Sequence, residues 1–168
     1  QTILPVGRDG MVDPEDVANA ITERTSLISI MYANNEVGSV QPLAQIGALA
    51  HEHGALVHTD AVQAAGQLSL DVQALNVDML SISAHKFYGP KGVGALYVRG
   101  GINIIPSQSG GSHENGRRAG THNTPFIVGM AKALELAYAE HKERVAHYIK
   151  LRDMLIDGIT QRIPSAQA

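Results

Sequence analysis

Cysteine is absent from the 168-residue sequence. Without it the chain forms no disulfide, holds no thiolate-bound metal and offers no thiol nucleophile. The lack of disulfides is compatible with the cytoplasm, which is the compartment we expect, without proving it.

Long apolar runs and a strong positive charge are also missing. No apolar stretch approaches the roughly 18 residues of a membrane-spanning helix, so we expect no membrane segment. The opening residues Gln1 to Pro5 lack the basic start of a secretory signal peptide. The formal net charge is −3, whereas general nucleic-acid binding needs clustered Lys and Arg to neutralise phosphates. We therefore expect neither a membrane nor a nucleic acid as a partner.

The residues that are present suit one globular domain. Hydrophobic residues make up 44% and charged residues 17% of a chain long enough to bury a sizeable core. The sequence begins abruptly at Gln1 and follows a helical pattern almost to its last residue, so we expect a piece of a longer protein.

Strand and helix patterns alternate along the first hundred residues. Asp13 before Pro14 favours a helix start, Pro42 opens a second helical stripe, and Gly54 favours its end. The expected helices cover 13–24 and 42–53, with a short helical turn at 62–66 and a second short helix at 71–75. The expected strands cover 26–33, 55–59, 79–83 and 94–99. This alternation is typical of an α/β domain with a mostly parallel sheet.

The remaining third of the chain has two parts. Residues 102–120 read as a loop rich in glycine. A long helical pattern begins at about Phe126, and it predicts either one helix that bridges domains or two helices broken near His141.

Polar residues follow three of the predicted strands at the point where each strand ends. Asn35 follows the first, Asp60 and Gln63 follow the second, and His85 with Lys86 follow the third. The carboxyl ends of parallel strands meet at one edge of a sheet, where ligands bind in such folds. We therefore expect these side chains to form the candidate site.

Lys86 is the candidate anchor for a covalently bound cofactor. An apolar run from Met79 to Ala84 delivers it to a stiff turn that contains Gly89 and Pro90. Lysine is rarely buried unless it is paired or chemically employed, and a desolvated amine can form a Schiff base. Taken alone, Lys86 is better explained as a solvated residue at a strand end.

Asp60 changes that balance, because pyridoxal 5'-phosphate needs a carboxylate opposite its ring nitrogen to keep the ring an effective electron sink. Gln63 can donate a hydrogen bond to the ring oxygen, and Asn35 can contact the ring or a substrate carboxylate. Each residue also has a structural explanation: Asp60 as an N-cap, Gln63 as its capping-box partner, and Asn35 as a turn residue.

Phosphate contacts can come from two places. Ser83 and His85 flank Lys86 and can both donate hydrogen bonds, although His85 is also explained as a packed histidine. The glycine-rich loop with Arg117, Arg118 and Thr121 can reach a phosphate or carboxylate, including one in a partner subunit, or can simply be solvated.

A metal site is not expected. His51 and His53 form a weak pair at a helix end, but residues two apart do not share a helix face.

Four segments, in their order and spacing, resemble the class V aminotransferase family of fold-type I pyridoxal-phosphate enzymes, and within it the cysteine desulfurases. The segments are 31–38 (MYANNEVG), 58–63 (HTDAVQ), 83–92 (SAHKFYGPKG) and 110–121 (GGSHENGRRAGT). The resemblance covers nearly the whole chain. It implies a three-layer α/β/α fold, with residues 1–140 as the central part of the large cofactor-binding domain and residues 141–168 as a helix leading toward a small C-terminal domain.

The resemblance also implies a role for each residue. Lys86 would bind the cofactor covalently and later act as general acid and base. Asp60 would pair with the ring nitrogen, Gln63 with the ring oxygen, and Asn35 with the ring oxygen or the substrate carboxylate.

Phosphate binding would fall to Ser83 and His85. Thr121 would reach the phosphate of the other subunit in a homodimer.

The implied reaction converts L-cysteine to L-alanine and leaves the sulfur as a persulfide for iron–sulfur cluster assembly, with sulfur acceptors or scaffold proteins as partners. The family's catalytic cysteine and its ring-stacking histidine do not occur among these residues, and Ser112 stands where a third glycine is common. We therefore expect this chain to be inactive alone. The alternatives are a selenocysteine lyase, an aminotransferase for a small amino acid, or a non-catalytic dimerisation or binding module.

Overall fold

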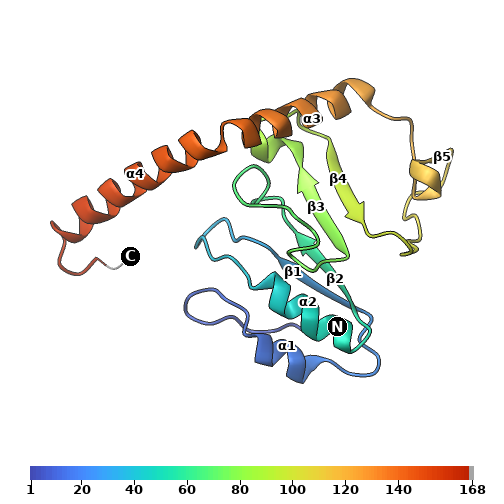
Figure 1. The fold of residues 1–168 in the computed structure, drawn as a ribbon, viewed down its shortest axis with the longest axis horizontal. Helices are drawn as coiled ribbons and strands as arrows, with labels where there is room; N and C mark the ends of the chain where they lie inside the picture. The colour runs from blue at the N-terminus through green and yellow to red at the C-terminus, as the bar shows by residue number, and fades with distance from the viewer. Residues whose placement is uncertain (167–168) are drawn as a thin grey trace.

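The structure of the chain is a computed structural model that describes residues 1–166. Gln167 and Ala168, the last two residues of the predicted 141–168 segment, lie outside the described residues. Figure 1 shows a twisted sheet at the centre, two helices below it, and a long helical arm that crosses its upper end and continues away from it.

The central sheet has four strands in the order β1-β2-β3-β4. Strands β1 (Leu27–Met31), β2 (Leu56–Asp60) and β3 (Met79–Ser83) run parallel, and β4 (Gly94–Val98) runs antiparallel to β3. The predicted mostly parallel α/β sheet is therefore confirmed, with each strand within about two residues of its expected bounds at either end.

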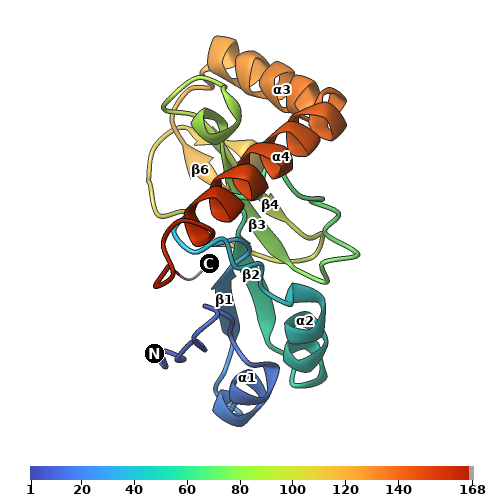
Figure 2. The ribbon, with the colours of Figure 1, turned by 90° about the vertical axis from the view of Figure 1, so that its left-hand side faces the viewer.

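Helices α1 (Pro14–Ala20) and α2 (Leu43–Glu52) pack on one face of the sheet, as Figure 2 shows for α2 beside β2. The Asp13 carboxylate caps α1 by accepting from the Glu15 amide at 2.8 Å, which confirms the predicted helix start. The helix stops at Ala20 rather than near residue 24, because Ile21 is extended and a turn closed by Thr22 and Thr25 follows.

The main core lies between α2 and the sheet. Leu43 and Ala50 of α2 pack with Val57, Val77 and Leu80, all of them buried. Residues 62–68 form the hydrogen-bonded helical turn expected at 62–66. Residues 72–76 form a turn and not the second short helix expected at 71–75, which corrects that prediction.

The other face of the sheet is more polar. It presents Ser29, His58 and Ser81, together with the exposed side chains of Leu27 and Leu96. Among residues 1–166 the helices α1 and α2 lie on the opposite face, so a second helical layer over this one stays a prediction for the longer protein.

The predicted loop 102–120 contains a small hairpin. Strand β5 (Ser112–His113) pairs antiparallel with β6 (Arg118–Ala119), and a single turn of 3₁₀ helix, η2 (Glu114–Gly116), connects them. Strands of two residues are too short to show a periodic signal in the sequence.

The long helical pattern forms two helices, α3 (Thr124–Ala139) and α4 (His141–Thr160). They meet at Glu140, so the predicted break near His141 is confirmed. No helix in the described part of the chain is both long and apolar enough to cross a membrane.

A buried carboxylate joins the helical layer to the sheet. Asp78 is only 3% exposed, and its oxygens accept from the Val57 amide at 2.7 Å and contact His51 Nε2 at 2.8 Å and Arg99 Nε at 3.3 Å. These contacts tie the end of α2, strand β2 and the residue after β4 to the start of β3.

Replacing Asp78 tests this junction. Asp78→Ala leaves the Val57 amide without its buried acceptor, so we expect the free energy of unfolding to fall by about 2 kcal/mol in urea denaturation of the purified protein. Asp153→Ala is the control, because it removes an exposed carboxylate paired with the adjacent Arg152 and should change stability by less than about 0.5 kcal/mol. Equal effects of the two substitutions would contradict the structural role of Asp78.

Candidate functional site

The candidate site lies at the carboxyl ends of β2 and β3. Asp60 is the last residue of β2 and pairs in register with Ser81, and β3 continues to Ser83 before the chain enters the 3₁₀ helix η1 (Ala84–Phe87) that carries Lys86. Parallel pairing of β2 and β3 thus brings the predicted carboxylate and the predicted amine to the same edge of the sheet.

The Lys86 turn is fixed by buried neighbours and a backbone hydrogen bond. Ala84 and Phe87 are buried on either side of it, while the Lys86 side chain is exposed. Tyr88 adopts the left-handed conformation, with φ of 65°, and the Gly89 amide donates to the Ala84 carbonyl at 2.9 Å.

Position 89 has no room for a side chain, so a glycine is required there. A Cβ at this position would lie 2.9 Å from the Cβ of Ala84 and 3.3 Å from that of Ala133 on α3. The stiff glycine–proline turn predicted from the sequence is present, and it leads into strand β4 instead of a helix.

Asp60 also stabilises the turn that follows it. One carboxylate oxygen accepts from the Val62 amide at 2.9 Å, so the capping role weighed as an alternative is real. Gln63 is half-buried on this turn and does not form the alternative capping-box bond with Asp60. One oxygen of Asp60 is therefore held in place by the Val62 amide. The side-chain amide of Gln63 forms no hydrogen bond with Asp60.

Ser83 and His85 form a pair next to Lys86. The Ser83 hydroxyl lies 2.9 Å from Nδ1 of His85, and the His85 side chain is exposed rather than packed. This bond uses one ring nitrogen, so Nε2 is the nitrogen with which His85 could hold an anion. The pair therefore places a hydroxyl and an imidazole beside the candidate amine.

Asn35 lies in the turn after β1, with its side chain exposed. The residue that organises this turn is its neighbour Asn34, whose Oδ1 accepts from the amides of Glu36 at 2.8 Å and Val37 at 3.0 Å. The turn-forming role considered for Asn35 therefore belongs to Asn34, and the Asn35 side chain remains at the surface.

Thr121 is exposed and comes two residues after β6. It follows the small hairpin, which Figure 1 shows beyond β4 and apart from the four-stranded sheet. Its contact with a phosphate in another subunit stays a prediction.

The hairpin loop is held by its own charged residues. Glu114 contacts His122 Nε2 at 2.8 Å and Arg118 at 3.7 Å, and Arg118 also donates to the carbonyls of Ala119 and Gly120. Arg118 thus stabilises the loop, whereas Arg117 is exposed.

The histidines at the end of α2 have structural partners. His51 contacts Asp78, and Nδ1 of His53 donates to the Leu49 carbonyl at 2.9 Å. No group of three or more His, Asp or Glu side chains within residues 1–166 is arranged to hold a metal ion.

His58 is a candidate residue to which the sequence analysis assigned no role. It lies two residues before Asp60 on the same face of β2, between two hydroxyls: Ser29 Oγ is 2.8 Å from Nδ1 and Ser81 Oγ is 2.9 Å from Nε2. A hydroxyl can donate or accept, so these two serines complement either tautomer of a neutral imidazole. Ser29, His58 and Ser81 lie on the same face of three neighbouring strands. The sequence alone does not show this, because the face that they share follows from the strand register.

Burial lowers the pKa of His58 below its ordinary value of 6.5, and the carboxylate of Asp60 opposes this shift. Burial therefore favours the neutral imidazole. Ser29, His58 and Ser81 together form a polar ladder across β1, β2 and β3, two residues before Asp60 on β2.

The side chains at this edge fit the donor set that pyridoxal phosphate requires. The edge offers a primary amine (Lys86), a carboxylate fixed through one oxygen (Asp60), and a hydroxyl–imidazole pair (Ser83 and His85) beside the amine. These groups suit a Schiff-base anchor, a partner for a protonated ring nitrogen and donors for a phosphate.

A sequence model of the family described as "Aminotransferase class-V" matches residues 2–167. The chain therefore belongs to the class-V aminotransferase family. Within that family it is similar to cysteine desulfurases. It is 54% identical over 158 residues to "Cysteine desulfurase IscS" of Methanosarcina thermophila, a match that covers 94% of this chain and 39% of that protein.

Solved structures agree with the fold. A structure described as "NIFS-LIKE PROTEIN" superposes with a TM-score of 0.91 at 44% identity, covering 95% of this chain and 44% of that one. Another, described as "SspA in complex with cysteine", gives a TM-score of 0.77 at 47% identity, with coverage of 80% and 39%. The predicted family and α/β fold class are confirmed, and the chain spans about two fifths of the length of the curated relative and of these structures.

The neutral state of His58 has a measurable consequence. Because its pKa is lowered in the folded protein, the unfolded chain binds the extra proton, and the stability from neutral His58 is present above pH 6.5 and lost as pH falls below that value. In His58→Gln, which cannot titrate, we expect a smaller loss of stability between about pH 7 and pH 5 than in the wild type, measured by urea denaturation at each pH. An equal loss in both proteins would show that His58 does not contribute.

Proposed function

We propose that the protein to which this chain belongs is a pyridoxal-phosphate-dependent cysteine desulfurase, which converts L-cysteine to L-alanine and passes the sulfur on for iron–sulfur cluster assembly. The observation that carries the proposal is the placement of Asp60 and Lys86 at the ends of two adjacent parallel strands. The similarity to proteins named cysteine desulfurase supports the choice of substrate.

Members of the class-V aminotransferase family depend on pyridoxal phosphate, and its bound ring withdraws electrons from the substrate carbon that loses a proton. In this proposal Lys86 holds the cofactor through Nζ. The same Nζ afterwards accepts the proton that the substrate carbon loses. Asp60 keeps a proton on the ring nitrogen through the oxygen that Val62 does not occupy.

The other predicted residues orient the bound group. Gln63 donates to the ring oxygen from the turn after β2, and Asn35 contacts the ring oxygen or the substrate carboxylate from the turn after β1. Ser83 and His85 bind the phosphate, and Thr121 reaches the phosphate held by the other subunit of a homodimer.

The sulfur-accepting thiol must come from another part of the protein, since these 168 residues contain no cysteine. We therefore expect this chain alone to leave sulfur on its substrate. In the longer protein, residues 1–140 would belong to the large domain, and the helix that begins at His141 would lead toward the small one. We further propose a cytoplasmic enzyme that delivers sulfur to acceptor or scaffold proteins.

A non-catalytic module of the same fold is the main rival of a different kind. Retention of Lys86 and Asp60 together argues against it, because a decayed site has no need of either. Only the longer protein can test this point, since its other segments complete the site.

Cofactor attachment is the first test. The full-length protein mixed with pyridoxal phosphate should develop the visible absorption band of a lysine-linked cofactor, and Lys86→Ala should abolish the band because the only proposed anchoring amine is removed. Lys132→Ala, an exposed lysine of α3 paired with Glu135, should keep the band. Absence of the band in the wild type, or its persistence in Lys86→Ala, would overturn the proposal.

The products are the second test. With L-cysteine and a thiol reductant, the full-length enzyme should form alanine and sulfide in equal amounts, because each carbon–sulfur cleavage yields one of each. A protein that forms the cofactor band but neither product is not a desulfurase. Turnover of selenocysteine but not of cysteine would favour a selenocysteine lyase. Transfer of the substrate's amino group to an added keto acid would favour an aminotransferase.

A further inference from the structure

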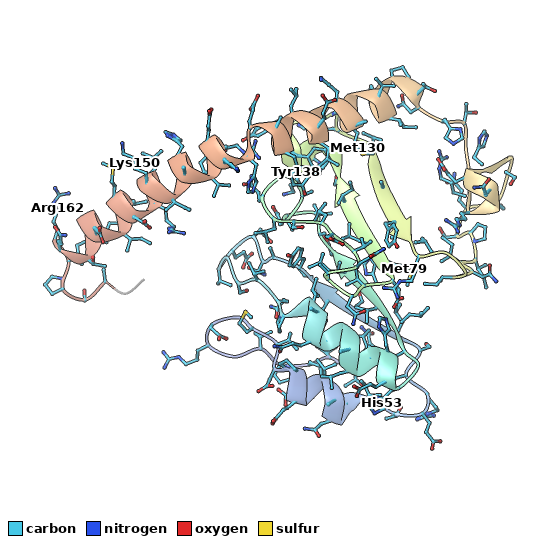
Figure 3. All side chains as sticks on the ribbon, viewed as in Figure 1. His53, Met79, Met130, Tyr138, Lys150 and Arg162 are labelled. Carbon is cyan, nitrogen blue, oxygen red and sulfur yellow. The ribbon has the colours of Figure 1, made fainter. Side chains whose placement is uncertain are left out.

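The junction of α3 and α4 contacts the turn that follows Asp60. Three side chains of the junction bind three consecutive backbone carbonyls of that turn. The bonds run from Tyr138 Oη to the Leu68 carbonyl (2.9 Å), from His141 Nε2 to the Gln67 carbonyl (2.8 Å) and from Arg144 Nη2 to the Gly66 carbonyl. We call Tyr138, His141 and Arg144 the junction clamp. Figure 3 shows Tyr138 on the part of α3 that lies over the upper end of the sheet.

The turn needs such partners because of its own hydrogen bonding. The amides of Ala64 and Ala65 donate to the Ala61 carbonyl, and the amides of Gln67 and Leu68 donate to the Ala64 carbonyl, so the segment is a short helical turn. The last carbonyls of any helical segment have no partner within it. Gly66 is buried, and a buried carbonyl without a partner destabilises the folded state. The clamp supplies donors at the carbonyls where the turn has none.

Arg144 makes a second contact that links the turn to α3. Its Nη2 also donates to the Ala137 carbonyl at 2.8 Å, near the C-terminal end of α3, where a cation is favourable for the helix. One half-buried guanidinium therefore joins the end of α3 to the end of the turn.

Helix α3 also supports the Lys86 turn. A single buried cluster contains Ala65, two residues after Gln63, together with Ala84 and Phe87, which flank His85 and Lys86, and Ala137 of α3. A Cβ on Gly66 would lie 3.0 Å from the Cβ of Ala137 and 3.4 Å from that of Phe87. The turn that carries Gln63 and the turn that carries Lys86 thus meet each other and α3 at close range.

We propose that Arg144 and Tyr138 are positioning residues for the cofactor site. They touch neither cofactor nor substrate. They hold the turn with Gln63 against α3, which also packs on the Lys86 turn, and so fix Asp60 and Gln63 relative to Lys86. This inference rests on the proposed binding of pyridoxal phosphate.

The test compares the dissociation constant for pyridoxal phosphate in full-length variants, measured from the absorption band. Arg144→Ala should weaken cofactor binding about tenfold, because it removes the guanidinium that bridges the Gly66 carbonyl of the turn and the Ala137 carbonyl of α3. Arg144→Lys keeps a charged donor and should recover part of this loss. Arg152→Ala removes an exposed arginine of α4 that pairs with Asp153, and it should bind the cofactor as the wild type does.

A second readout separates positioning from general stabilisation. The pH midpoint of the absorption band depends on how the lysine and the ring are placed, so it should shift in Arg144→Ala. A lower melting temperature with an unchanged dissociation constant and an unchanged midpoint would overturn the inference.

Two further outcomes are decisive. Should Arg144→Ala fail to fold, Tyr138→Phe takes its place. It removes one hydroxyl donor and should weaken cofactor binding about threefold, and no weakening would overturn the inference. A wild-type protein that forms no band at all overturns the proposed function itself, whereas a normal wild-type band with unaffected variants overturns only the positioning role.

Discussion

Parallel pairing of β1, β2 and β3 is the constraint on which the candidate site depends. Parallel strands all end at one edge, so Asp60 and Lys86, which come from separate strand–turn units, are brought together without any direct bond between them. The apolar faces of the strands fix the register, because a slip of one residue would place His58 and Ser81 in the core. The position of the polar side chains at this edge is thus a consequence of the burial of apolar side chains on the opposite face of the sheet.

Two kinds of support lie beneath that edge. On the polar face of the sheet, His58 lies between Ser29 and Ser81, two residues before Asp60, and burial lowers its pKa and so favours the neutral imidazole. On the other side, α3 packs against the turns on which Gln63 and Lys86 are carried. The exposed Lys86 side chain consequently lies between buried neighbours, which suits the anchoring role proposed for it.

Local patterns in the sequence were enough to predict the strands, the cap at Asp13 and the break near His141, because each depends on neighbouring residues. They also placed the polar side chains at the strand ends. They did not reveal that Asn34, and not Asn35, forms the turn after β1. The two side chains are chemically the same, and only the backbone conformation decides which of them accepts from the turn. His58 and Arg144 could not be found either, because their partners lie on other strands or far along the chain.

The contacts between the α3–α4 junction and the turn after Asp60 also bear on the order in which the protein forms during synthesis. Their partners are 70, 74 and 78 residues apart in sequence. A ribosome makes about 5–20 residues per second, so the turn emerges several seconds before the side chains that complete it. Until Arg144 has left the ribosome, the Gly66 carbonyl of the turn lacks the donor that it has in the folded protein. The turn beside the proposed cofactor site is therefore completed late, after the sheet itself has been made.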